Sequence, residues 1–461
     1  MSDQAFYIPV VVRSLDPALF PRDASLIDAQ GRLMIVDEVL AALARTAGLS
    51  LETLFLACYV VSLLVVWTGL WLIGTRVYRS PWAVAALAAA FTMRHRIPRT
   101  SVNSLEPYFL PRVLAFGIGM LAVAALLRRR PWTAIILIAL AAAVHVTTAL
   151  WFAVFVGVAL AVLDSHLRRL VIAGAAVAVV VLIAAVAAGP LRGTLTTMDA
   201  TWLQAVASKD SLFATQWPAW AWAANLGFFA LLAWAHGARA RRGDATAEDG
   251  ALVRGAGALV ALFLVTLPLV AAGMSLAVQF QIARVFWLVD LLALVYVVAA
   301  VCDSRTAQIR GIAVAIAVIL FATGRGLYVM LAERPERPLF AVHLPVSPWE
   351  DAMAWLRRQP RDTHVFADPG HGWKYGTSVR VSAERDVLLE EVKDSALAIY
   401  SREVAVRVVD RTQAIGDFTS LTAEHARELA RRYDLDVLVT ETDLALPLAY
   451  RNDQFRIYSL R

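Results

Sequence analysis

Four separate stretches of the sequence contain polar side chains that could together transfer a chemical group. They hold carboxylates, guanidinium groups, an imidazole, a phenol and an amide, at Asp3, Tyr7, Arg94, Arg96, Glu106, Arg112, His145, Gln281 and Arg284. A carboxylate can act as general base on an acceptor hydroxyl or amine, and arginine pairs with phosphate oxygens and stabilises a departing phosphate. This combination is typical of transfer from a donor that carries phosphate.

The composition indicates that most of the elements that position these side chains lie in a membrane. Hydrophobic residues make up 59% of the 461 positions and charged residues only 17%, whereas a soluble domain is about half apolar and a quarter charged. Residues 131–163 and 170–190 are almost free of charge, but residues 333–461 are charged at ordinary density. The chain therefore has a membrane body and a polar tail. The net charge of +6 comes without a basic stripe with interleaved aromatic residues, so we predict no nucleic-acid partner.

The apolar segments predict an α-helical polytopic membrane protein with about ten spans. The predicted spans are 53–74, 81–93, 108–127, 131–145, 147–163, 170–189, 218–236, 255–272, 285–302 and 310–331. As a single helix, the stretch 131–163 would be about 50 Å long, against a hydrocarbon core of about 30 Å. Because both of its flanks are basic, we predict a hairpin of two short spans that turns near 145–148.

The positive-inside rule orients these spans. It places five short basic loops in the cytoplasm, marked by Arg76 and Arg79, Arg128–Arg130, Arg168 and Arg169, Arg239–Arg254, and Arg305 and Arg310. An even number of crossings then puts both residues 1–52 and the tail outside. Since residues 1–50 contain no signal peptide, this topology predicts a further N-terminal helix that precedes the present start.

The predicted organisation has three parts: an extracytoplasmic first loop at 1–52, a transmembrane bundle at 53–331 and a small extracytoplasmic α/β domain at 332–461. Alternating helical and extended patterns in the tail predict this domain. The expected helices are Trp349–Arg358, Asp394–Ile415 and Thr422–Tyr433, and the expected strands are Thr363–Ala367, Val379–Val381, Leu435–Thr440 and Phe455–Leu460.

The opening Asp3-Gln4-Ala5-Phe6-Tyr7 resembles the first-loop acidic motif of the GT-C superfamily, which includes protein O-mannosyltransferases and aminoarabinose transferases. In that superfamily the motif is often Asp-Glu-x-x-Tyr-like, and here Gln4 occupies the second acidic position. Longer stretches are similar to a bacterial multi-pass group related to the superfamily. These stretches are Asp3–Asp23, Tyr108–Arg112, His145–Trp151 and Gln281–Trp287.

The resemblance implies a GT-C-like transferase that moves a glycosyl or related group from a polyprenyl-phosphate donor to an extracytoplasmic acceptor. It implies Asp3 as the base and Arg94, Arg96, Arg112 and Arg284 as donor-phosphate ligands. Tyr7, Glu106, His145 and Gln281 would support them. Because metal use varies in the superfamily, we assign no metal site and no cofactor, and a divalent metal ion stays open. The expected location is the bacterial inner membrane.

Other readings of the same residues remain open. The chain could be a transporter or lipid flippase, which would place polar groups near the bilayer midplane, or a scaffold that binds envelope partners through its tail. The cluster Arg94–Arg99 could pair with lipid headgroups, and His145 could simply end a helix. Asp23 lies near Pro21, which favours a turn role, and Asp290 lies deep in a span and needs a partner.

Overall fold

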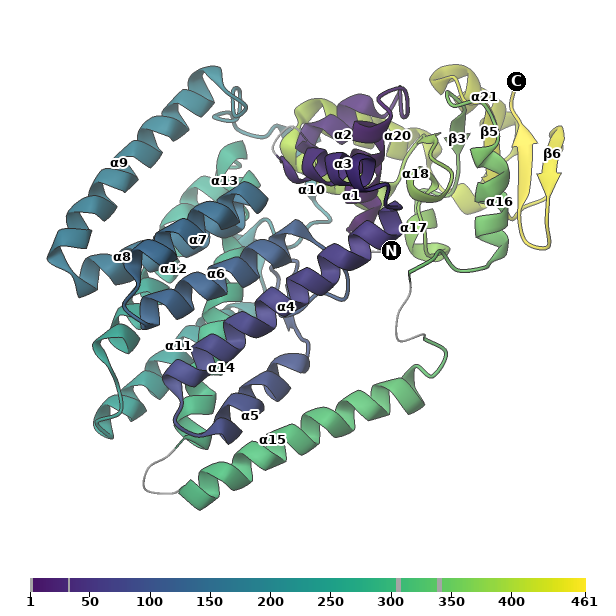
Figure 1. The fold of residues 1–461 in the computed structure, drawn as a ribbon. Coiled ribbons are helices and arrows are strands. Elements are labelled where there is room, and N and C mark those ends of the chain that lie inside the picture. The colour runs from purple at the N-terminus through teal and green to yellow at the C-terminus, as the bar shows by residue number, and fades with distance from the viewer. Residues whose placement is uncertain (1–2, 32–33, 304–307, 338–341) are drawn as a thin grey trace. The chain divides into compact units, whose positions relative to one another are not determined.

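The computed structural model describes residues 3–31, 34–303, 308–337 and 342–461, and these are mostly helical (Figure 1). The chain forms two compact units. The helical unit consists of Ala57–Thr196 and Asp210–Phe340. The mixed unit, which contains the larger sheet, consists of Met1–Leu56, Thr197–Lys209 and Ala341–Arg461. Arg305, one of the predicted cytoplasmic residues, lies outside the described residues.

Each of the ten segments that the sequence predicts as spans overlaps a helix of the helical unit. The helices are α4 (Leu51–Val77, which begins in the mixed unit), α5 (Pro81–Thr92), α6 (Pro111–Leu127), α7 (Pro131–Val144), α8 (Val146–Leu163), α9 (Ser165–Ala188), α11 (Ala219–Arg241), α12 (Ala247–Ala271), α13 (Ser275–Gln279), α14 (Val285–Cys302) and α15 (Gln308–Tyr328). Short 3₁₀ turns η1 (Ala214–Gln216) and η2 (Ile282–Arg284) and the π-helical turn η3 (Val329–Glu333) extend them.

Six stretches within the described residues are long and apolar enough to cross a bilayer, namely α4, α8, α9, α12, α13 with α14, and α15 with η3. The membrane character predicted from the composition is therefore supported. Helices α5, α6 and α7 are apolar but have only 12, 17 and 14 residues, fewer than the about 20 that a span needs. The total of about ten spans stays a prediction.

Local sequence signals explain where several of these helices begin and end. Pro81, Pro111 and Pro131 each occupy the start of a helix, where a missing N–H costs no hydrogen bond. His145 is extended, with φ −157°, and its imidazole accepts a hydrogen bond from the Thr148 amide at 3.2 Å. The stretch 131–163 is thus two helices, as predicted, and α7 packs against both α6 and α8 (Figure 1).

The mixed unit is built from segments that lie far apart in the sequence. Its sheet has the order β4-β3-β5-β7-β6, where β3 pairs in parallel with β4 and β5, and β7 pairs antiparallel with β5 and β6. The strands are β3 (His364–Phe366), β4 (Asp386–Val387), β5 (Val437–Thr440), β6 (Leu448–Arg451) and β7 (Arg456–Ser459). The helices are α1 (Gln4–Leu15), α2 (Ala24–Gly31), α3 (Val36–Ala47), α10 (Ala200–Val206), α16 (Pro348–Arg357), α17 (His371–Lys374), α18 (Val379–Ser382), α19 (Glu391–Leu397), α20 (Arg402–Ile415) and α21 (Ala423–Tyr433), with 3₁₀ turns η4 (Ala398–Tyr400) and η5 (Phe418–Ser420).

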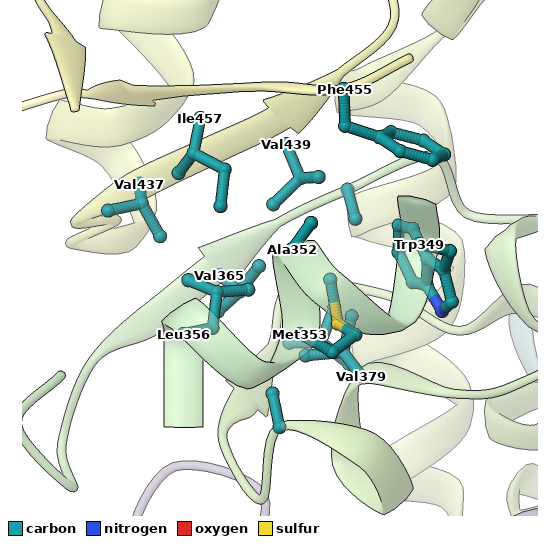
Figure 2. Packing of buried hydrophobic residues seen from close by; sticks show 13 residues of the cluster. Trp349, Ala352, Met353, Leu356, Val365, Val379, Val437, Val439, Phe455 and Ile457 are labelled. Carbon is teal, nitrogen blue, oxygen red and sulfur yellow. The ribbon is translucent and has the colours of Figure 1, made fainter. Parts of the chain in front are cut away.

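Helix α16 covers the sheet with one apolar face. Trp349, Met353 and Leu356 of this helix pack on valines and Ile457 of the central strands, and all of them are buried (Figure 2). Ser347 caps the helix by accepting the Glu350 amide hydrogen bond. The residue patterns of the tail predicted the four elements α16, β3, β5 and β7, and the structure adds how they pack.

One predicted strand is wrong. Residues 379–381 form the helical turn α18 instead, because Ser378 caps this turn by accepting a hydrogen bond from the Arg380 amide at 3.1 Å. The buried guanidinium of Arg380 also binds the carboxylates of Asp23 and Asp394, which holds the turn in place. Strands β4 and β6 were not predicted, since β4 has only two residues and β6 is largely exposed.

The N-terminal segment is held in this unit by a buried carboxylate. Asp23 is fully buried and accepts hydrogen bonds from Arg380 Nε at 2.7 Å, from the Val387 amide at 3.1 Å and from Arg407. Arg380 in turn binds Asp394 through two nitrogens, at 2.6 and 3.1 Å. Burial alone would raise the pKa of the Asp23 carboxyl, but the charges of Arg380 and Arg407 hold this pKa below its ordinary value. Asp23 therefore does more than shape a turn.

Candidate functional site: a basic groove in the helical unit

A short hairpin presents the first predicted cluster. Strands β1 (Arg96–Ile97) and β2 (Val102–Asn103) pair antiparallel between α5 and α6. Ile97 and Val102 are fully buried and anchor the hairpin, whereas Arg96 beside them is exposed. Asn225 of α11 fixes the turn, since its side-chain amide donates to the Pro98 carbonyl at 2.9 Å. The alternation of strand side chains thus directs Arg96 away from the core.

This hairpin forms one wall of a groove of about 560 Å³, and the end of α15 with η3 forms the other. The residues from the hairpin side are Thr92, Met93, Arg94, His95, Arg96 and Asn103, and those from the helix side are Ala322, Arg325, Gly326, Val329, Met330, Glu333, Arg334 and Arg337. The positions 322, 326, 329, 330 and 333 recur at helical spacing and lie on one face of the helix. The groove therefore combines charged side chains on both walls with apolar side chains on the helix wall.

Positive charge dominates the groove. Five arginines and His95 line it, against the single carboxylate of Glu333. Among the described residues, the side chains of Arg96 and Arg325 form no hydrogen bond or ion pair, and both are exposed. Like charges that gather in a concave surface raise the local concentration of anions. The site is therefore suited to an anionic group.

A buried carboxylate connects the groove to the predicted residue Arg112. Glu106 is 1% exposed and lies 3.6 Å from Arg94 and 3.4 Å from Arg112. The side-chain amide of Asn103 donates to both Glu106 oxygens, at 3.1 and 3.0 Å. Arg112 is itself buried at the start of α6. The structure thus brings Arg94, Glu106 and Arg112 together, with Arg94 in the groove and Arg112 behind it.

The groove also supplies the partner that Asp290 requires. His95 Nε2 lies 3.1 Å from both oxygens of the buried Asp290 carboxylate, and its Nδ1 lies 3.4 Å from the Met93 carbonyl. Both ring nitrogens therefore face acceptors, which favours the protonated imidazolium. The hydrogen bond to Asp290 raises the pKa of His95 above its ordinary value, although burial opposes this shift.

A second cluster surrounds the helix break at His145. Both Arg112 and Arg284 lie within electrostatic range of this imidazole. Gln281 is buried and adopts a left-handed backbone, with φ 50°, where α13 gives way to η2 and then α14. The structure therefore gathers His145, Arg112 and Arg284 from three separate helix ends. Arg112 is the residue that belongs to both clusters.

The remaining predicted residues, Asp3 and Tyr7, belong to the mixed unit. Asp3 precedes α1 and accepts a hydrogen bond from Lys393 Nζ at 3.0 Å. Tyr7 is buried in α1 beside Phe6, with ring centroids 5.2 Å apart. Their roles as base and supporting residue stay predictions. Within the described residues, no group of three or more His, Cys, Asp or Glu side chains could hold a metal ion.

Sequence reasoning missed the arginines of the groove's helical wall. Arg325 follows a long apolar run in α15, and Arg334 and Arg337 follow in the next turns. Their spacing places them at the end of a predicted span, on the same predicted side as Arg94 and Arg96. That shared side was the available signal, but the pairing of this helix end with the hairpin depends on tertiary packing.

Comparison of the chain with protein-family models, curated proteins and solved structures gives no match. The function must therefore be argued from the site itself.

Proposed function

We propose that this protein is a membrane transferase that takes a glycosyl or related group from a polyprenyl-phosphate donor and passes it to an extracytoplasmic acceptor. The observation that carries the proposal is the groove, which five arginines and His95 line together with the apolar residues Ala322, Val329 and Met330 of its helix wall. A lipid phosphate needs both features, since its headgroup is anionic and its chain is apolar.

Within this proposal, Arg96 and Arg325 bind the donor phosphate, because their guanidinium groups are exposed and have no protein partner among the described residues. Arginine binds phosphate through planar pairs of N–H donors, and such charge-assisted bonds are stronger than neutral ones. Arg94 also lines the groove, and its ion pair with Glu106 holds the guanidinium group there. Arg112 and Arg284 act from behind the groove through His145 and Glu106.

A phosphate bound among these arginines would become a better leaving group, because the guanidinium charges stabilise the negative charge that develops on it. The acceptor needs a general base, and Asp3 has this role by the GT-C resemblance. The proposed location is the bacterial inner membrane, with the mixed unit on the extracytoplasmic side and contributing to acceptor recognition.

The test measures binding of a radiolabelled polyprenyl phosphate to the full-length protein in detergent micelles. Arg96→Ala with Arg325→Ala should weaken binding about tenfold to a hundredfold, since a hydrogen bond to a charged group contributes about 1.5–3 kcal/mol. Arg310→Ala is the matched control, because Arg310 is also exposed on α15 but does not line the groove. It should bind the lipid as the unaltered protein does.

Two further measurements separate a transferase from the competing classes. The corresponding polyprenol, which lacks phosphate, should bind equally to all variants. A polyprenyl-phosphate sugar should lose its sugar to an acceptor in the presence of the unaltered protein and more slowly with the double variant. Binding without any transfer would favour a lipid transporter, and equal binding by the double variant would refute the phosphate site.

A further inference from the structure

Helix α3 of the mixed unit is apolar on two opposite faces. Leu40, Ala41 and Ala44 are buried and pack toward α1. Ile35, Val39 and Leu43 are instead 62%, 50% and 45% exposed. Because an α-helix has 3.6 residues per turn, the exposed residues form one stripe at i, i+4 and i+8, about half a turn from the buried face.

This exposed stripe is distinct from scattered surface hydrophobic residues, which need no explanation. Three large aliphatic side chains follow one another along one side of a single helix, and the polar residues Glu38 and Arg45 lie outside the stripe. Burial of a Val, Leu or Ile side chain is worth about 1.5–3 kcal/mol relative to exposure. The stripe would therefore be stabilised by an apolar partner.

The sequence that follows α3 leads into an apolar helix. Gly48 ends the helix in the left-handed conformation, with φ 63°, and α4 begins at Leu51. α4 is one of the six helices that can cross a bilayer. Because each residue spans at most about 3.5 Å, Ala47 lies within about 14 Å of the first residue of α4. Leu49, between the two helices, is also apolar and 41% exposed.

We propose that α3 lies in the membrane interface, with Ile35, Val39 and Leu43 inserted among the lipid headgroups and the first methylene groups of the acyl chains. Amphipathic helices bind this region with their apolar face buried about 5–10 Å. The core face of α3 holds α1 at the same time, so the helix connects the N-terminal segment of the mixed unit with the bilayer surface. This inference is independent of the proposed transferase activity.

The test places a nitroxide label at single positions of the full-length protein in liposomes of phosphatidylethanolamine and phosphatidylglycerol. The native thiols are first removed by Cys58→Ser and Cys302→Ser. Val39→Cys and Leu43→Cys then label the stripe, and Glu38→Cys labels the neighbouring exposed polar position as the control. Electron paramagnetic resonance measures collision of each label with oxygen, which concentrates in lipid, and with a water-soluble nickel complex.

At positions 39 and 43, oxygen should relax the label several times more strongly than the nickel complex does, whereas at position 38 the order should be reversed. Equal access of the nickel complex to positions 38 and 39 would overturn the proposal. Protection of position 39 from both reagents, together with spin–spin broadening, would show that a second copy of the chain covers the stripe and would also overturn it. Because all three labelled side chains are exposed, the labels leave the buried face of α3 intact.

Discussion

The buried charges around Asp23 and the open charges around Arg96 show two opposite uses of arginine in one chain. In the mixed unit, Arg380 is 2% exposed and is surrounded by Asp23, Glu390 and Asp394. In the groove of the helical unit, five arginines and His95 face a single glutamate. Charges that are paired and desolvated hold a fold together, whereas unbalanced cations that line an open concave surface attract a ligand.

The comparison teaches that composition alone does not separate these uses. Arg380 and Arg325 have the same side chain, so the residue type does not distinguish a stabilising role from a binding role. What differs is the supply of carboxylates within reach: Asp394 binds Arg380 at 2.6 Å, while Arg325 has no such partner among the described residues. The first arginine should therefore control stability and the second should control binding.

The largest effect should come from the buried network. Asp23→Asn keeps the shape of the side chain but removes the negative charge that balances Arg380 and Arg407. Loss of one partner of a buried ion pair costs about 3–5 kcal/mol, so the free energy of unfolding of the mixed unit should fall by about this amount. Thermal unfolding and hydrogen exchange of β3 and β5 in the full-length protein would measure it. An unchanged exchange rate in these strands would contradict the role of Asp23.

A smaller effect should appear when the pH is changed around the groove. The pKa of His95 is raised above its ordinary value by Asp290, so the imidazolium is present at low pH and is lost as the pH rises through this raised pKa. When the imidazolium is lost, the affinity for a polyprenyl phosphate should fall about two- to fivefold, since a partly exposed charge pair contributes at most about 1 kcal/mol.

The control for this prediction is His95→Gln, which removes the titrating group. The phosphate itself gains negative charge near about pH 6, so the informative quantity is the difference between the two pH profiles. The profile of the variant should lack the decline that the unaltered protein shows at higher pH. Identical profiles would mean that His95 does not contribute its charge to the bound phosphate.

The smallest effect should come from an ion pair on the surface of the mixed unit. Arg361 Nη1 donates to Asp16 at 2.6 Å, but the Arg361 side chain is 66% exposed. Exposed pairs contribute about 0–1 kcal/mol, so Arg361→Ala should leave thermal unfolding almost unchanged. If Arg361→Ala lowered the free energy of unfolding as much as Asp23→Asn, burial would not be what distinguishes the two ion pairs.

The sequence predicted much of the fold, and the reasons for the misses are local. Apolar runs located the helices of the helical unit, amphipathic periodicity located α16 and α21, and extended patterns located β3, β5 and β7. The strand predicted at 379–381 was wrong because three alternating residues are a weak signal, whereas the Ser378 cap and the buried Arg380 stabilise a helical turn. In the candidate site, Arg94, Glu106 and Arg112 were predicted and lie together. Arg325 was not predicted, because its proximity to the hairpin depends on long-range packing.

The sequence by itself determined which segments are apolar helices and where they break, since hydrophobic runs, prolines and caps act over a few residues. It did not determine which of these helices is buried among the others. The stretches that contain α9 and α14 have mean hydropathies of 3.0 and 2.5, yet the first has 0% and the second 83% of its most apolar window buried. Tertiary packing made that choice, because apolar side chains lose as little by facing lipid as by facing other helices. The same packing placed the end of α15 opposite Arg96, which created the groove.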